Sequence, residues 1–160
     1  MDIKVALLKN IKTAVMVDCT IFSQDIILNS AANALKNGAK IIQFYSKNAT
    51  DKQNLETALK LRQLCSIFNA LLIINSRVDI AQIVQADGVC LFEDDISFIN
   101  AKKILDENKI IAQHITTLEN ALSAIDNNVN YICINSNLNS SLKGKLEALN
   151  KIKIIELNRQ

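Results

Sequence analysis

The sequence predicts an α/β protein built on an all-parallel sheet of about seven βα units. Two observations carry this prediction. Short apolar runs recur along the chain, at 14–17, 41–44, 71–74, 89–92, 110–112, 131–134 and 152–157. The segments between them have helical periodicity, and a crossover between parallel strands is usually helical. The pattern alone allows a (β/α)8-type barrel or an open doubly wound sheet.

The expected helices follow from apolar residues spaced three and four apart and from capping residues. They occupy 26–36, 51–68, 77–84, 97–107, 117–125 and 143–150. In the second, Leu61, Leu64 and Cys65 share a face, and Thr116 or Thr117 is a suitable N-cap for the fifth, with Glu119 in its first turn. No linker or change of composition divides the chain, so we expect one domain over residues 1–160.

Composition excludes several classes of function. Hydrophobic residues make up 49% of the 160 residues, which is too many for a disordered chain. The net charge of +2, without a basic run, gives no reason to expect nucleic acid as a partner. No apolar run is long enough to span a membrane, and the first ten residues lack a signal-peptide layout. We therefore expect a cytoplasmic protein without a membrane partner.

Cysteine and glycine usage narrows the chemistry further. The four cysteines are widely spaced without a CxxC motif, so a zinc site is unsupported and we expect mainly buried, reduced thiols. Glycine occurs only three times and proline never, and no GxGxxG or Walker motif is present. Nucleotide binding of those types is therefore excluded. Asparagine is abundant and can occupy the left-handed backbone positions usually left to glycine.

Several fragments occur in a characteristic order. They are VD at 17–18, GAKIIQFYSK at 38–47, NSRVD at 75–79, ADGVCL at 86–91, TLENA at 117–121 and NYICI at 130–134. In this order and spacing the chain resembles the thiamine-phosphate synthase and thiazole tautomerase superfamily. The resemblance implies a (β/α)8-type TIM barrel, truncated here to about seven βα units.

The resemblance also implies a reaction and a set of residues. The family joins hydroxymethylpyrimidine pyrophosphate to thiazole phosphate, and Mg²⁺ accompanies the leaving pyrophosphate. By position, Gln43 and Asn75 match a polar pair that contacts the pyrimidine. Lys47 and Lys143 match pyrophosphate-binding lysines, and Asp95 matches a Mg²⁺ carboxylate.

The chain departs from the family pattern at several of these positions. Tyr45 replaces an arginine that would grip phosphate with two parallel hydrogen bonds. Ser76 replaces a metal-binding aspartate, and His114 replaces a phosphate-contacting serine, which makes it a further expected substrate-binding residue. The loop NSNLNSSLK keeps only Lys143 of its family motif, with Ser140 in place of one threonine. The chain also ends at Gln160, so we expect the eighth unit and its glycine-rich phosphate loops to be missing.

Two functions remain open on this evidence. One is a transferase of thiamine biosynthesis with weakened activity or an altered substrate, although the departures above predict that the full synthase activity is absent or very low. The other is a non-catalytic paralogue that binds a phosphorylated heterocycle or a partner protein.

Simpler structural roles remain open for single residues as well. His114 could be an ordinary strand-end histidine, and Lys47 and Lys143 could be solvated. The acidic loop 93–95 could cap the helix that begins near residue 97. Arg77 and Asp79 are expected to form a local ion pair.

The missing eighth unit leads to a prediction about assembly. Seven strands would leave the first and seventh with unpaired backbone groups at an open edge. A homodimer in which two chains cover each other's gap is the expected solution. The rival is the N-terminal run 3–8, whose strand-like composition could let it fold back as a plug.

Overall fold

The computed structural model describes residues 3–20, 23–135 and 140–159, and within them strands and helices alternate. The strands are β1 (Thr13–Asp18), β2 (Ile41–Tyr45), β3 (Leu71–Asn75), β4 (Gly88–Leu91), β5 (Ile110–His114), β6 (Tyr131–Asn135) and β7 (Ile154–Arg159). The helices are α1 (Ile3–Leu8), α2 (Gln24–Lys36), α3 (Asp51–Ile67), α4 (Val78–Ile83), α5 (Phe98–Ile104), α6 (Leu118–Asp126) and α7 (Ser140–Leu149). Every strand and helix predicted from the sequence is confirmed to within a few residues.

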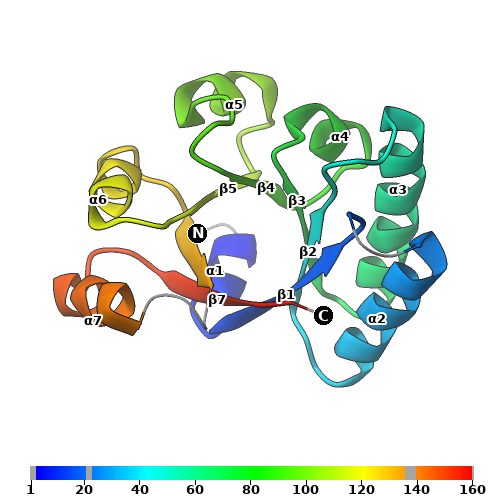
Figure 1. Cartoon of the computed structure of the whole chain (residues 1–160), viewed down its shortest axis with the longest axis horizontal. Coiled ribbons are helices and arrows are strands. Elements are labelled where there is room, and N and C mark those ends of the chain that lie inside the picture. Colours follow the sequence, from blue (N-terminus) through cyan, green and yellow to red (C-terminus); the bar gives the residue numbers. More distant parts are fainter. Residues whose placement is uncertain (1–2, 21–22, 136–139, 160) are drawn as a thin grey trace.

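The described strands form one closed, all-parallel barrel in sequence order, with α2 to α7 outside it (Figure 1). β7 pairs directly with β1, from Thr13 opposite Glu156 to Met16 opposite Arg159. The Glu156 N–H also donates to the Lys12 carbonyl at 2.9 Å. The truncated barrel is therefore confirmed, and the open doubly wound sheet is wrong.

The expected open edge is also wrong, because the β1–β7 ladder gives the backbone groups of both strands hydrogen-bond partners. The homodimer inferred from that edge stays a prediction and loses this support.

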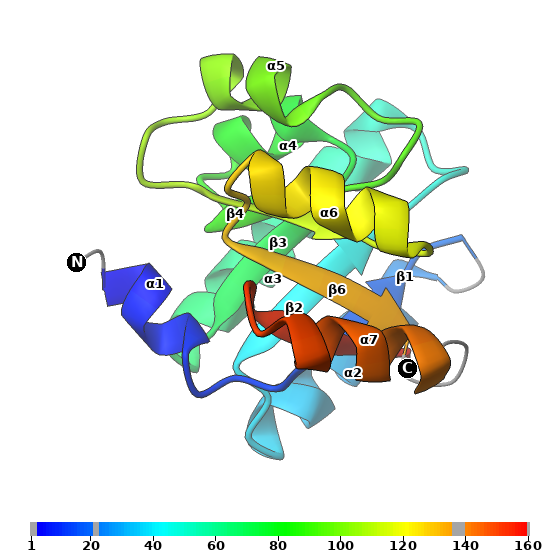
Figure 2. The ribbon, with the colours of Figure 1, turned by 90° about the vertical axis from the view of Figure 1, so that its left-hand side faces the viewer.

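The N-terminal run forms α1, so the expected strand-like plug is wrong in its secondary structure. α1 lies at the end of the barrel opposite the chain's C-terminus (Figure 2). Leu8 is 3% exposed and packs with Ala14, Ile41 and Leu71 in the barrel interior, and Ile11 packs against the same cluster. The run therefore closes the amino-terminal end of the barrel, which is a different place from the expected gap.

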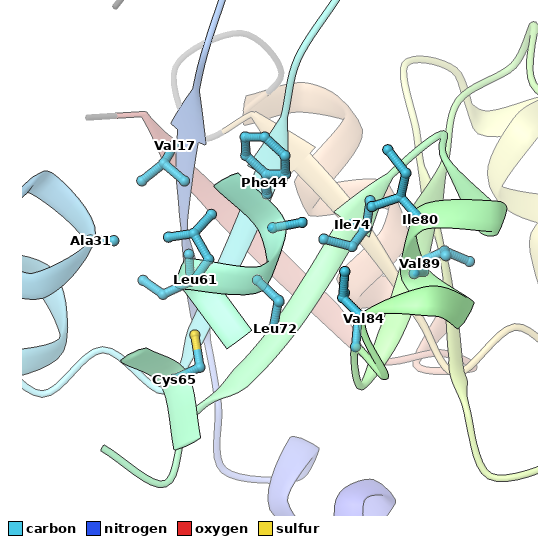
Figure 3. Packing of buried hydrophobic residues seen from close by; sticks show 14 of the residues in the cluster. Val17, Ala31, Phe44, Leu61, Cys65, Leu72, Ile74, Ile80, Val84 and Val89 are labelled. Carbon is cyan, nitrogen blue, oxygen red and sulfur yellow. The ribbon is translucent and has the colours of Figure 1, made fainter. Parts of the chain in front are cut away.

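Two apolar layers hold the barrel together, and both are almost entirely aliphatic. The interior cluster just described fills the barrel. The outer layer consists of a small cluster between β6 and helices α6 and α7, and a larger cluster between the outer faces of β1 to β5 and helices α2 to α5. Figure 3 shows this packing, with Leu61 and Cys65 of α3 directed at Leu72 of β3, and Val84 directed at Ile74 and Val89. Alternation along each strand sends one residue inward and the next outward, so both layers are built from the same short runs.

Asparagine ends several helices in place of glycine, as the composition predicted. Asn69, Asn128 and Asn150 have φ angles of 50°, 57° and 48°, just after α3, α6 and α7. Asparagine tolerates this left-handed conformation better than most residues. Gly88 is required for a different reason. A Cβ added there would overlap the carbonyl oxygen of Ile110 on β5.

Candidate functional site at the barrel mouth

The carboxyl ends of all described strands meet at one face, which is where barrels of this kind carry their sites. We call this face the barrel mouth and define it by the last residue of each strand. These residues are Asp18, Tyr45, Asn75, Leu91, His114, Asn135 and Arg159. Parallel pairing in sequence order brings together side chains that lie far apart in the chain.

Gln43 and Asn75 lie just inside the mouth, on neighbouring strands. Gln43 is 0% exposed and Asn75 is 3% exposed. Neither the Nε2 nor the Oε1 atom of Gln43 makes a hydrogen bond of ordinary geometry with the described residues, and the same holds for the Oδ1 atom of Asn75. The Asn75 Nδ2 atom has only the Met16 sulfur as a partner, at 3.7 Å. Burying an amide without partners costs about 1–3 kcal/mol, so these atoms are the strongest sign of a binding site.

Sulfur atoms lie beside these amides, and the Tyr131 phenol shares the barrel interior with them. The Sγ atoms of Cys90 and Cys133 are 3.0 Å apart in the interior, and both cysteines are free. Burial, followed by the neighbouring Cys133 thiol, raises the pKa of Cys90 well above its usual range. The Cys90 thiol is therefore protonated at neutral pH and is a poor nucleophile. The Tyr131 hydroxyl is also buried without a described partner, and burial is the main cause of its raised pKa.

Three rings form a row across the mouth. The centroids of Tyr45 and Phe92 are 5.8 Å apart, at a tilt of 42°. The Phe92 ring in turn stacks on His114, with centroids 4.8 Å apart and planes 22° apart. All three side chains are partly exposed. Phe92 was not predicted as a site residue, because the sequence shows it only as the end of an apolar run.

The His114 imidazole lies in an environment that favours its neutral form. Burial is the largest influence and lowers the pKa of His114 below its ordinary value of 6.5. A hydrogen bond with Asn135 opposes this shift, and the positive charge of Arg159 adds to it. His114 therefore presents an uncharged ring to the mouth at neutral pH.

The expected phosphate ligands are placed less favourably. Lys47 is exposed in the loop after β2, where its backbone N–H lies 3.4 Å from the Thr20 hydroxyl. The Lys143 ammonium donates to the Glu156 carboxylate of β7, and that bond raises the pKa of Lys143. Residues 136–139 of the neighbouring loop lie outside the described residues. Pyrophosphate binding by Lys47 and Lys143 stays a prediction.

The expected magnesium ligand has a local structural role. One oxygen of Asp95 accepts the Phe92 N–H at 2.7 Å and closes the turn after β4. The acidic loop does not cap α5, because Ser97 is the N-cap and its hydroxyl accepts from the Asn100 N–H at 3.3 Å. Among the described residues, no three histidine, cysteine or acidic side chains come together as a metal site. The residues described here therefore do not fit a magnesium ion held by the protein alone.

Ser76, where the family resemblance places the second metal carboxylate, has a left-handed backbone with a φ of 63°. Its N–H donates to the Cys90 carbonyl at 3.0 Å, which holds the turn at the mouth. Arg77, the next residue, grips both carboxylate oxygens of Asp79 at 2.9 and 2.7 Å. The expected local ion pair is therefore confirmed, and Arg77 also bonds to Asp51 at 2.6 Å.

A closed parallel barrel with buried polar groups at its carboxyl-terminal face defines a protein of the TIM-barrel type. Residues 14–158 match the family described as thiamine monophosphate synthase. The chain belongs to this family.

Two curated relatives show how much of the chain is shared. The thiamine-phosphate synthase of Clostridium acetobutylicum is 31% identical over 144 residues, which are 89% of this chain and 68% of that protein. That of Nostoc punctiforme is 42% identical over 106 residues, which are 66% of this chain but only 30% of the relative.

Solved structures extend the comparison to the fold. Thiamine phosphate pyrophosphorylase from Pyrococcus furiosus has a TM-score of 0.81 at 30% identity, over 95% of this chain and 77% of that one. An aldolase from Zymomonas mobilis that acts on 2-keto-3-deoxy-6-phosphogluconate has a TM-score of 0.69 at 11% identity, which indicates a shared fold alone. Within the described residues, no helix is long and apolar enough to cross a membrane.

Proposed function

We propose that this protein acts in thiamine biosynthesis and that its barrel mouth binds the hydroxymethylpyrimidine ring. The observation that carries the proposal is the pair of buried amides of Gln43 and Asn75, in which both Gln43 polar atoms and the Asn75 Oδ1 atom lack a hydrogen bond of ordinary geometry with the described residues. A side-chain amide offers both a donor and an acceptor, and so does the edge of an aminopyrimidine. A ring seated there would supply the missing hydrogen bonds and recover part of the desolvation cost of the two amides.

We further propose that the transfer reaction is slow or absent. A pyrophosphate leaving group needs cations that are held in place. Lys47 is available for this role, but it is exposed, and the Lys143 ammonium is already bonded to Glu156. Magnesium bound by the leaving group would neutralise its charge. Asp95 offers this ion one carboxylate, and Ser76 offers no second one.

The second candidate is a non-catalytic paralogue that binds a phosphorylated heterocycle or a partner protein through the same mouth. The Lys143–Glu156 ion pair favours this alternative, because it removes one of the two expected pyrophosphate ligands. The two functions share the ring site and differ only in whether product forms.

Calorimetry with the hydroxymethylpyrimidine alcohol and with its pyrophosphate, each with and without Mg²⁺, tests the ring site. We expect at least one ligand to bind, and Gln43→Leu or Asn75→Leu to weaken it more than tenfold through loss of an about 1.5 kcal/mol hydrogen bond. Gln113→Leu is the matched control, because Gln113 alternates with the inward-facing Ala112 and so lies on the outer face of β5. If neither ligand binds, or if the control weakens binding equally, the ring site is misassigned.

An assay for thiamine phosphate with the purified protein separates the two candidates. We expect turnover to be far below that of the relative from Clostridium acetobutylicum assayed in parallel. Turnover equal to that relative would contradict the proposal of a weak or absent transfer reaction. Lys47→Ala should lower binding of the pyrophosphate and leave binding of the alcohol unchanged.

A further inference from the structure

We propose that the barrel mouth selects a flat, uncharged heterocycle and binds the free pyrimidine alcohol at least as tightly as its pyrophosphate. This inference rests on the proposed ring site and concerns which chemical form of the ligand the site prefers. It is carried by the aromatic row Tyr45–Phe92–His114 and by the charges around it.

The row concentrates rings in a chain that has few of them. The sequence holds two tyrosines, five phenylalanines and a single histidine, and three of these eight rings meet at the mouth. Tyr45 follows Gln43 by two residues on β2, so both side chains point into the barrel, and Tyr45 packs on the interior cluster. The aromatic row therefore lies nearer to the opening of the barrel than the Gln43 amide does. A planar ligand that reaches Gln43 with its edge would lie against aromatic faces.

The charge at the mouth opposes an anion. The strand ends and the loop after β4 carry four carboxylates, of which Glu93 and Asp94 are exposed and screened by water, whereas Asp95 is partly buried and Asp18 is buried. Asp18 is only 6% exposed, and its Oδ1 atom accepts the Thr20 N–H at 2.8 Å. A buried carboxylate at this level would repel a nearby phosphate, since charges interact strongly where water is excluded.

The cations at the same face do not balance these acids. Lys47 and Arg159 are exposed, where ion pairs contribute little because water screens them. The Arg77 guanidinium is bonded to Asp79 and Asp51. His114, the ring closest to the Phe92 face, is held neutral by burial. The described residues at the mouth therefore favour stacking and amide pairing over binding of a pyrophosphate.

The test compares both ligands, without metal, in the wild-type protein and in Tyr45→Arg. In the wild type we expect the alcohol to bind with a dissociation constant no larger than that of the pyrophosphate. Tyr45→Arg places a cation with a fixed fork of donors at the mouth and removes a stacking face. It should tighten binding of the pyrophosphate at least tenfold and weaken binding of the alcohol. Gln63→Arg is the control, because Gln63 is exposed on α3 and gives the same change of net charge.

Phe92→Leu tests stacking without any change of charge. Stacking of a base on an aromatic side chain is sequence-tolerant and strong enough that its loss should weaken the alcohol about tenfold. Circular dichroism checks that each variant is folded.

Tighter binding of the pyrophosphate than of the alcohol by wild type, or an unchanged preference in Tyr45→Arg, overturns this inference and leaves the proposed ring site standing. Failure of both ligands to bind overturns the ring site and this inference together.

Discussion

Replacing Gln43 with leucine should make the protein more stable while weakening ligand binding more than tenfold. Gln43 is 0% exposed, and neither polar atom of its amide makes a hydrogen bond of ordinary geometry with the described residues, although the amide acts on the pKa of the neighbouring Cys90 thiol and lowers it. Its register partners on the neighbouring strands are Met16 and Ile73, so the position is lined by apolar side chains. Leucine has a similar size and loses no solvation there.

The magnitude follows from the unpaired amide. Mutational data put the cost of burying such a group at about 1–3 kcal/mol, and Gln43→Leu removes this cost. Imperfect packing of the branched side chain offsets part of the gain, because shape changes in a core cost up to about 1.5 kcal/mol. We therefore expect the free energy of unfolding to rise by about 1 kcal/mol, which corresponds to roughly 2–4 °C in Tm for a protein of this size.

The assay is urea unfolding followed by circular dichroism, paired with calorimetry of ligand binding. Gln113→Leu, on the outer face of β5, should change the free energy of unfolding much less and leave binding intact. If Gln43→Leu lowers the free energy of unfolding by more than 1 kcal/mol, the Gln43 amide has hydrogen-bond partners inside the barrel in solution. Its missing hydrogen bonds would then no longer be evidence for a binding site. The expected result, in which stability rises while binding weakens, is common when binding residues are replaced.

Three further perturbations probe the fold and the mouth. Gly88→Ala should lower the free energy of unfolding by about 2–4 kcal/mol, because the new Cβ overlaps a β5 carbonyl and disrupts hydrogen bonds between β4 and β5. Gly144→Ala should raise it by about 1 kcal/mol, because Gly144 lies inside α7 with open space around it. Thermal melts of the two variants must therefore shift in opposite directions. Asp87→Asn should lower the unfolding free energy by about 2–3 kcal/mol in denaturant titrations, since it weakens a 2.5 Å ion pair with Arg62; an unchanged midpoint would contradict this. Because burial lowers the pKa of His114, the folded state binds its proton less readily than the unfolded state does, so stability should fall as pH drops below about 6.5. His114→Gln should flatten that dependence, and an identical pH profile would show that other groups cause it.

The strands and helices were predictable because each depends on local pattern. Runs such as LLIIN and YICIN are continuous, as buried parallel strands require, and the segments between them are long enough for a crossover helix. The closure of the barrel was not predictable in this way. Whether β7 meets β1 depends on how seven strands stagger around the barrel, which no single segment encodes. The run IKVALL is also too short and too uniformly apolar for its periodicity to distinguish a strand from α1.

The site was predictable only in part, for similar reasons. Gln43 and Asn75 were recognisable because polar side chains directly within or after apolar runs are costly to bury without a use. The stacking of Phe92 on His114 brings together residues at the ends of β4 and β5. The aromatic row therefore forms only when the barrel is folded, and no local sequence pattern predicts it. The ion pair between Lys143 and Glu156 depends on how α7 lies against β7, and sequence position alone assigned that lysine to phosphate.

Hollow space alone does not locate the site, because a cavity of about 480 Å³ in the loops after β1 and β2 is matched by one of about 500 Å³ at the other end of the barrel. The latter lies between α1 and the strand starts and is lined by Ala6, Leu7, Asn10, Ile11, Lys40, Asn69 and Leu71. Its polar residues, Asn10, Lys40 and Asn69, are exposed, so water already satisfies them and no ligand is required. At the mouth the situation is reversed, because the Gln43 amide is cut off from solvent and makes no hydrogen bond of ordinary geometry with the described residues. A buried polar group that lowers stability is expected mainly at functional sites. Buried polar atoms without hydrogen bonds therefore locate the site better than cavity volume does.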